Sequence, residues 1–115
     1  MASALRLRPL QDIAEIQTQP YPSIILQVQD EDISTGCLIL TVEGLGAMNL
    51  TITFNSNYPL TPPTIWMDSK VTHPNMNEAG NICASILDTK MDYTPAYTLT
   101  EIAIQLLSFF SDDRI

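Results

Sequence analysis

Two cysteines and one histidine are the side chains of this 115-residue chain best suited to covalent chemistry. Cys37 and Cys83 are too few for a disulfide framework, and with His73 they cannot supply four Cys and His ligands to a zinc ion. Each cysteine is therefore considered as a thiol. A thiolate attacks acyl carbons well, whereas a free cysteine without that role usually packs as a small apolar side chain. The residue types alone leave both interpretations open.

The two cysteines lie in different kinds of segment. Cys83 falls within residues 69–95, which keep neither helical nor strand periodicity and are interrupted by proline, glycine and asparagine. Long irregular segments of compact domains are usually functional or disordered, and the apolar residues Ile82 and Ile86 favour a loop anchored on a core. Cys37 falls within a predicted strand, so we expect it to be packed and unreactive.

Periodic segments precede this loop. A short amphipathic helix is predicted over residues 9–18, with Pro9 as its first residue and with Leu10, Ile13, Ala14 and Gln17 recurring at helical spacing on its inner face. Strands are predicted over residues 23–29, 37–43, 47–54 and 64–68, because their apolar residues alternate or cluster as they do in half-buried sheets. The short connections DEDISTG (30–36) and Gly44-Leu45-Gly46 favour an antiparallel meander.

A second helix follows the loop. Thr98 and Glu101 have the spacing of a capping box, and the apolar residues after them repeat at helical spacing: Leu99, Ile102, Ala103, Leu106, Leu107 and Phe110. The pattern predicts a single α+β domain over residues 1–115. It consists of an N-terminal helix, a four-stranded antiparallel sheet, the long loop with Cys83, and a helix packed on the sheet.

The segments Tyr58-Pro-Leu-Thr-Pro-Pro63, His73-Pro-Asn75 and Gly80-Asn-Ile-Cys83 resemble, in order and spacing, the core signature of the ubiquitin-conjugating enzymes. The resemblance implies the fold of that family, and it implies that Cys83 is the catalytic nucleophile. Cys83 would accept ubiquitin or a ubiquitin-like protein from an activating enzyme as a thioester, then pass it to a substrate lysine or to a ligase. ATP is used by the activating enzyme, so no cofactor and no metal is expected on this chain.

The same resemblance assigns roles to other residues. Asn75 matches an asparagine whose amide stabilises the oxyanion formed during lysine attack, although an asparagine after proline is also a common turn residue. His73 and Pro74 match scaffold residues that shape the loop. Leu60, Pro95 and Ala96 match the positions at which family members contact RING-type ligases.

Four features depart from the family pattern. The turn Gly44-Leu45-Gly46 is short, and the segment between Cys83 and Pro95 is about two residues longer than usual and has Tyr93 where tryptophan is common. The first helix carries few basic residues. The sequence also ends at Ile115, about where relatives continue to a gate residue and two further helices. We expect a domain that lacks these last two helices, either as a minimal family member or as a fragment of a longer protein.

Two other functions compete with this one. The first is a non-catalytic interaction module of the same fold, similar to RWD domains, which bind partners without carrying a thioester. The second is a cysteine hydrolase that uses Cys83 with His73 as its base, which needs an orienting acid that the sequence does not reveal.

Composition limits the partners. A formal net charge of −8 with only five Lys and Arg argues against nucleic acid. The sequence has no apolar run long enough for a membrane span and no apolar leader, so we expect no membrane partner and a cytoplasmic or nuclear location. Ile104 and Phe109 fall outside the main apolar face of the last helix. We expect them to be exposed and to support weak self-association or contact with a missing partner segment.

Overall fold

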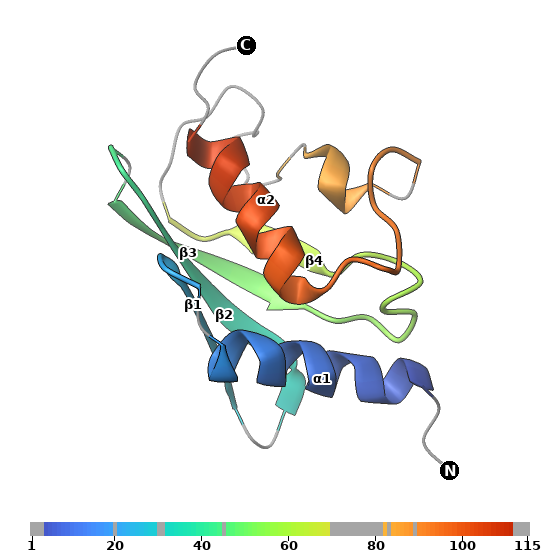
Figure 1. The fold of residues 1–115 in the computed structure, drawn as a ribbon. Coiled ribbons are helices and arrows are strands. Elements are labelled where there is room, and N and C mark those ends of the chain that lie inside the picture. Colours follow the sequence, from blue (N-terminus) through green and yellow to red (C-terminus); the bar gives the residue numbers. More distant parts are fainter. Residues whose placement is uncertain are drawn as a thin grey trace.

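The computed structural model describes residues 4–19, 21–29, 32–44, 46–69, 82, 84–88 and 90–111. In chain order the elements are α1 (Ala4–Thr18), β1 (Ile24–Gln29), β2 (Asp32–Val42), β3 (Gly46–Thr53), β4 (Thr64–Met67), the short 3₁₀ helix η1 (Ser85–Leu87) and α2 (Leu99–Ser111). Figure 1 shows α2 lying across the sheet, with α1 along the side of the sheet formed by β1 and β2. The predicted α+β architecture is confirmed.

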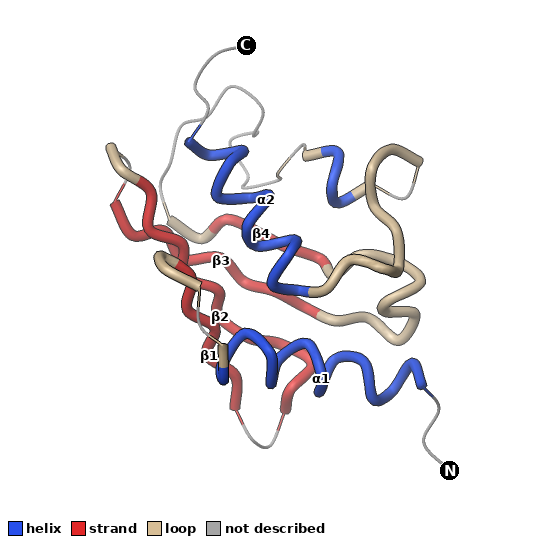
Figure 2. Tube along the Cα trace, in the orientation of Figure 1, coloured by secondary structure: helices blue, strands red, loops and turns tan. Residues whose placement is uncertain are grey.

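The sheet is the antiparallel meander that the turn lengths predict. Its strands lie in the order β1-β2-β3-β4, as Figure 2 shows. One row of paired residues crosses all four strands and is buried throughout: Leu26, Leu38, Leu50 and Met67. Gly44 and Gly46 both have positive φ angles, 89° and 79°, which suit the tight turn between β2 and β3.

The second strand is longer than predicted, because it begins at Asp32 within the segment expected to be a connection. Residues 32–36 were not predicted as strand because Gly36 interrupts the alternation of apolar and polar side chains. The structure gives the reason for a glycine here: a Cβ on Gly36 would lie 2.6 Å from Cγ1 of Val28 and 2.9 Å from the carbonyl oxygen of Gln27. The close approach of β1 to β2 therefore requires a residue without a side chain.

The first helix differs from its prediction in two ways. It begins at Ala4, so Pro9 lies inside it rather than at its start; proline has a helical φ and costs the helix one hydrogen bond. Its buried face consists of Asp12, Ile13 and Ile16, while Leu10, Ala14 and Gln17 are exposed. The predicted apolar face was therefore rotated away from the true one, because a paired carboxylate occupies an inward position.

The last helix follows its prediction closely. Thr98 and Glu101 form both bonds of the capping box: the Thr98 N–H donates to Oε1 of Glu101 at 2.9 Å, and the Glu101 N–H donates to Oγ1 of Thr98 at 3.3 Å. The buried face contains Leu99, Ile102, Ala103, Leu106 and Phe110, with Leu107 half-buried. Neither helix in the described part of the chain is long and apolar enough to cross a membrane.

The expectation that Ile104 and Phe109 are exposed is wrong. Both side chains are half-buried and pack against the hydrophobic core. The large apolar side chains that are exposed lie elsewhere among the described residues: Leu7, Leu10, Tyr21, Ile25, Leu60, Trp66 and Met91. The predicted self-association through α2 therefore loses its structural basis.

Candidate active site

The residues predicted to act in catalysis lie in the segment that the structure does not describe. Cys83 and Asn75, together with the predicted scaffold residues His73 and Pro74, fall outside the described residues. Their roles remain predictions.

The described residues on both sides of Cys83 are anchored on the core. Ile82 forms a β-bridge, and Ile82 and Ala84 are half-buried and pack against the hydrophobic cluster. Immediately afterwards, η1 places Ile86 among the buried residues, with Leu87 packed against them. The predicted anchoring of this part of the loop is therefore confirmed.

Cys37 is a free cysteine in β2 and is only half-buried. Leu38 and Leu40 point into the core, so the alternation of the strand turns Cys37 to the opposite face of the sheet. There it lies between Gln27 of β1 and Thr51 of β3. Cys37 is therefore less buried than the expected packing implies, and its lack of reactivity remains a prediction.

Leu60 lies in a corner that connects β3 to β4 and is 56% exposed. The peptide bond between Tyr58 and Pro59 in this corner is cis. Asn55 organises the corner: its Oδ1 accepts bonds from the N–H of Asn57 and from Oγ1 of Thr61, each at 2.9 Å. Sequence analysis missed Asn55, although asparagine is a common turn-forming residue. The corner thus presents an apolar side chain on a backbone fixed by side-chain bonds.

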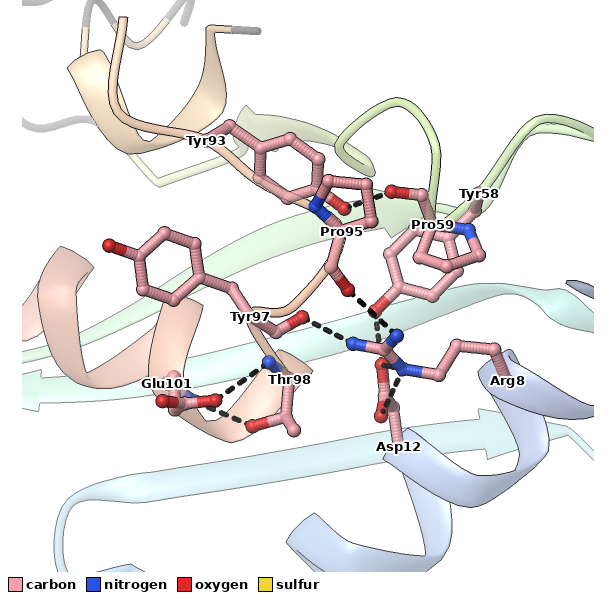
Figure 3. A network of polar contacts seen from close by, with 9 residues as sticks. All are labelled: Arg8, Asp12, Tyr58, Pro59, Tyr93, Pro95, Tyr97, Thr98 and Glu101. Carbon is pink, nitrogen blue, oxygen red and sulfur yellow. Dashed lines mark hydrogen bonds and ion pairs between the residues drawn. The ribbon is translucent and has the colours of Figure 1, made fainter.

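Pro95 and Ala96 lie in the loop before α2, and both are exposed. Tyr93, two residues earlier, is buried, and its hydroxyl donates a hydrogen bond to the carbonyl oxygen of Pro59 at 2.6 Å. Figure 3 shows this bond joining the loop to the corner. The segments that carry Leu60, Pro95 and Ala96 are therefore directly connected. These three exposed residues, which are the predicted ligase contacts, are called the docking face below.

Beneath the docking face lies a buried carboxylate that sequence analysis overlooked. Asp12 of α1 is 2% exposed, and both of its oxygens lie 3.1 Å from Nε of Arg8. The hydroxyl of Tyr58 donates a further hydrogen bond to Asp12. The spacing of Arg8 and Asp12, four residues apart on a helix, was the available signal for this ion pair.

Burial controls the ionisation of the two tyrosines in this region. Loss of hydration raises the pKa of Tyr58, and the hydrogen bond to Asp12 raises it further because a phenolate could not donate that bond. Loss of hydration also raises the pKa of Tyr93, partly opposed by the positive charge of Arg8. Both hydroxyls therefore remain protonated donors at neutral pH.

One acidic residue of the long loop, Asp88, has a structural role. Asp88 is exposed and shapes a turn: its Oδ1 accepts the N–H of Lys90 at 2.8 Å, and its carbonyl accepts the N–H groups of Met91 and Tyr93. Turn formation accounts for this residue without a catalytic role. No group of three or more His, Cys, Asp or Glu suited to a metal ion occurs among the described residues.

Comparison with known proteins identifies the family. The family model described as "Ubiquitin-conjugating enzyme" matches residues 8–114 of this chain. The chain therefore belongs to the ubiquitin-conjugating enzyme family. Among solved structures, human ubiquitin-conjugating enzyme E2 G1 is similar, with a TM-score of 0.84 and 23% sequence identity over 96% of this chain and 99% of that chain. At this identity the likeness shows a shared fold.

Proposed function

We propose that this protein accepts ubiquitin or a ubiquitin-like protein as a thioester on Cys83 and transfers it to a substrate lysine or to a ligase. The observation that carries the proposal is the family match, which spans residues 8–114 and so includes Cys83. The core-anchored residues on either side of Cys83 support it. The chemistry needs no cofactor on this chain.

The proposed reaction has two acyl transfers. In the first, the Cys83 thiolate attacks the thioester carbonyl held by the activating enzyme, a new C–S bond forms, and the thiolate of the activating enzyme leaves. In the second, a neutral lysine amine attacks the Cys83 thioester, an amide forms, the Cys83 thiolate leaves, and the proton lost by the amine passes to solvent. Asn75 would donate a hydrogen bond to the oxyanion of the second transfer, and His73 and Pro74 would shape the loop around it.

A charging assay tests the assignment. The protein is incubated with activating enzyme, ATP and ubiquitin, and in parallel with ubiquitin-like proteins and their activating enzymes, then analysed on a non-reducing gel. We expect a band shift that thiols reverse. Cys83→Ala should abolish the shift, Cys83→Ser should give a thiol-resistant ester, and Cys37→Ala is the matched control that should still charge. If no modifier charges the folded protein, the non-catalytic module is favoured instead.

The role of Asn75 separates the two transfers. Asn75→Ala should still charge, but it should discharge to free lysine roughly 100-fold more slowly, because one oxyanion donor is lost. Single-turnover discharge of the purified thioester measures this rate. An unchanged rate would return Asn75 to the role of a turn residue.

We further propose that a RING-type ligase binds the docking face. Exposure of Leu60, Pro95 and Ala96 on two connected segments supports this proposal. Leu60→Ala and Ala96→Asp should each reduce ligase-stimulated discharge while charging is retained. The probe is the RING domain that binds the wild-type protein most tightly in an array of purified RING domains. Equal stimulation of wild type and both variants would show that the ligase binds elsewhere.

A further inference from the structure

The ion pair between Arg8 and Asp12 has no part in the acyl transfers proposed above, yet its carboxylate is buried, where a charge is energetically unfavourable. Burying a carboxylate is unfavourable unless it is paired and hydrogen-bonded. Here Asp12 is buried and receives bonds from Arg8 and from Tyr58. Apolar residues of similar volume would often stabilise such a site as well or better. The remaining contacts of Arg8 indicate what the pair does.

Arg8 reaches across the molecule with its two terminal nitrogens. Nη1 donates to the carbonyl oxygen of Pro95 at 2.8 Å, and Nη2 donates to the carbonyl oxygen of Tyr97 at 2.5 Å. Figure 3 shows the guanidinium between the carboxylate of Asp12 on one side and these carbonyls on the other. The two carbonyls belong to the residues that precede and follow Ala96, so Arg8 holds the backbone on both sides of one docking residue.

The internal bonds of this loop do not by themselves place it on the protein. The N–H of Ala96 donates to Oγ1 of Thr94 at 3.2 Å, and the N–H of Tyr97 donates to the carbonyl oxygen of Thr94 at 3.1 Å. These bonds close a turn within residues 94–97. Arg8 joins that turn to α1, and the Tyr93 hydroxyl joins the preceding residue to the corner that carries Leu60.

We propose that Arg8 is a positioning residue for the docking face: held in orientation by Asp12, it fixes the backbone around Ala96 so that Pro95 and Ala96 are presented in one conformation to a ligase. The identity of the partner rests on the proposed function. A planar guanidinium can bond one carboxylate and two carbonyls at once, whereas a lysine ammonium lacks this fixed arrangement of donors. A loop that is already ordered pays less conformational entropy on binding.

An Arg8 variant could weaken docking either because the protein is less stable or because the loop around Ala96 is no longer positioned, and the two effects must be separated. Arg8→Gln leaves the buried carboxylate of Asp12 without its cation, so the protein should be destabilised and docking should weaken. The double variant Arg8→Gln/Asp12→Asn removes the uncompensated charge and permits an amide–amide bond between residues 8 and 12. Its melting temperature should therefore recover toward that of the wild type. One amide cannot replace the bonds to both Pro95 and Tyr97, so docking should stay weak.

Amide hydrogen exchange and affinity for a RING domain are measured for four proteins: wild type, Arg8→Gln, the double variant and Lys90→Gln. Lys90→Gln removes an exposed cation and serves as the charge control. Hydrogen exchange measured by NMR at Ala96 and Tyr97 should be faster in both Arg8 variants than in wild type and Lys90→Gln. Affinity for the selected RING domain should fall roughly tenfold in both Arg8 variants and stay unchanged in Lys90→Gln.

The outcomes are distinct. If docking and amide protection recover together with stability in the double variant, Arg8 is a merely structural residue and the inference is overturned. If amide exchange changes as expected while no RING domain binds the wild type, Arg8 still positions the loop and the ligase assignment fails. If exchange at Ala96 and Tyr97 is the same in all four proteins, Arg8 does not position the loop.

Discussion

Replacement of Tyr58 by phenylalanine removes one hydroxyl from the centre of the molecule and nothing else. Tyr58 is 1% exposed, and its hydroxyl donates to the buried carboxylate of Asp12. A hydrogen bond to a charged group contributes about 1.5–3 kcal/mol, so Tyr58→Phe should lower the free energy of unfolding by that amount at neutral pH. At about 4 °C per kcal/mol, the melting temperature should fall by about 6–12 °C.

The stability that the Tyr58 hydroxyl contributes decreases at alkaline pH. The pKa of Tyr58 in the folded protein is raised above its ordinary value of 10.0, so above pH 10 the hydroxyl ionises in the unfolded chain and stays protonated in the folded one. The stability that Tyr58 contributes is therefore complete below pH 10 and is lost as the pH rises, by about 1.4 kcal/mol per pH unit. Tyr58→Phe has no hydroxyl at position 58, so its stability does not fall for this reason. The difference of about 1.5–3 kcal/mol should therefore narrow by about 1.4 kcal/mol for each pH unit above 10.

Urea unfolding followed by circular dichroism at pH 7 to 11.5 measures both quantities, with Tyr21→Phe at neutral pH as the control for removal of an exposed tyrosine hydroxyl. Tyr58→Phe should be clearly less stable than Tyr21→Phe at pH 7. The curves of wild type and Tyr58→Phe should converge at high pH. Parallel curves across the whole range would show that Tyr58 is not a buried donor to Asp12, and the reasoning about this site would be wrong.

Three further predictions concern the scaffold. Gly36→Ala should lower the unfolding free energy by about 1–3 kcal/mol, because its new methyl group meets Val28 and the Gln27 carbonyl; chemical denaturation should show this, and wild-type stability would refute the close approach. Thr98→Ala removes one bond of the capping box and should cost about 1 kcal/mol, measured as a fall in melting temperature that Ser108→Ala, on the exposed side of the same helix, should not reproduce. Ile104→Ser should destabilise the protein and leave its sedimentation unchanged, since Ile104 packs against the core; a shift from dimer to monomer would instead support association through α2.

The elements defined by local rules were predictable. The capping box of Thr98 and Glu101, the meander and the short glycine turn each depend on neighbouring residues, and the structure contains all three. Periodicity alone could not orient α1, because it treats every charged residue as exposed. Asp12 is buried on account of Arg8 and Tyr58, and Tyr58 lies 46 positions away in the sequence.

In the candidate site, too, short motifs could be recognised in the sequence, whereas contacts between distant segments could not. The resemblance to the ubiquitin-conjugating enzymes pointed to the motif around Cys83 and to Leu60, Pro95 and Ala96, and their roles remain predictions. The long-range bonds that hold the segments of Leu60, Pro95 and Ala96 could not be predicted, because they join side chains to backbone carbonyls of distant segments, as Tyr93 does with Pro59. A carbonyl oxygen is present at every position, so the sequence carries no signal for which one is used.

The bonds from Arg8 to Pro95 and Tyr97 join positions 87 and 89 residues apart, whereas the strands of the sheet pair with their sequence neighbours. Contacts between sequence neighbours close small loops and can form early in folding, while contacts across most of a chain pay the largest loop-closure entropy. The docking face is therefore complete only when α1 is packed against the loop that precedes α2 and Arg8 bonds its backbone. A partly folded chain, or one whose first helix has detached in a local unfolding event, would keep most of its sheet, yet its loop over residues 94–97 would lack the bonds that join it to α1.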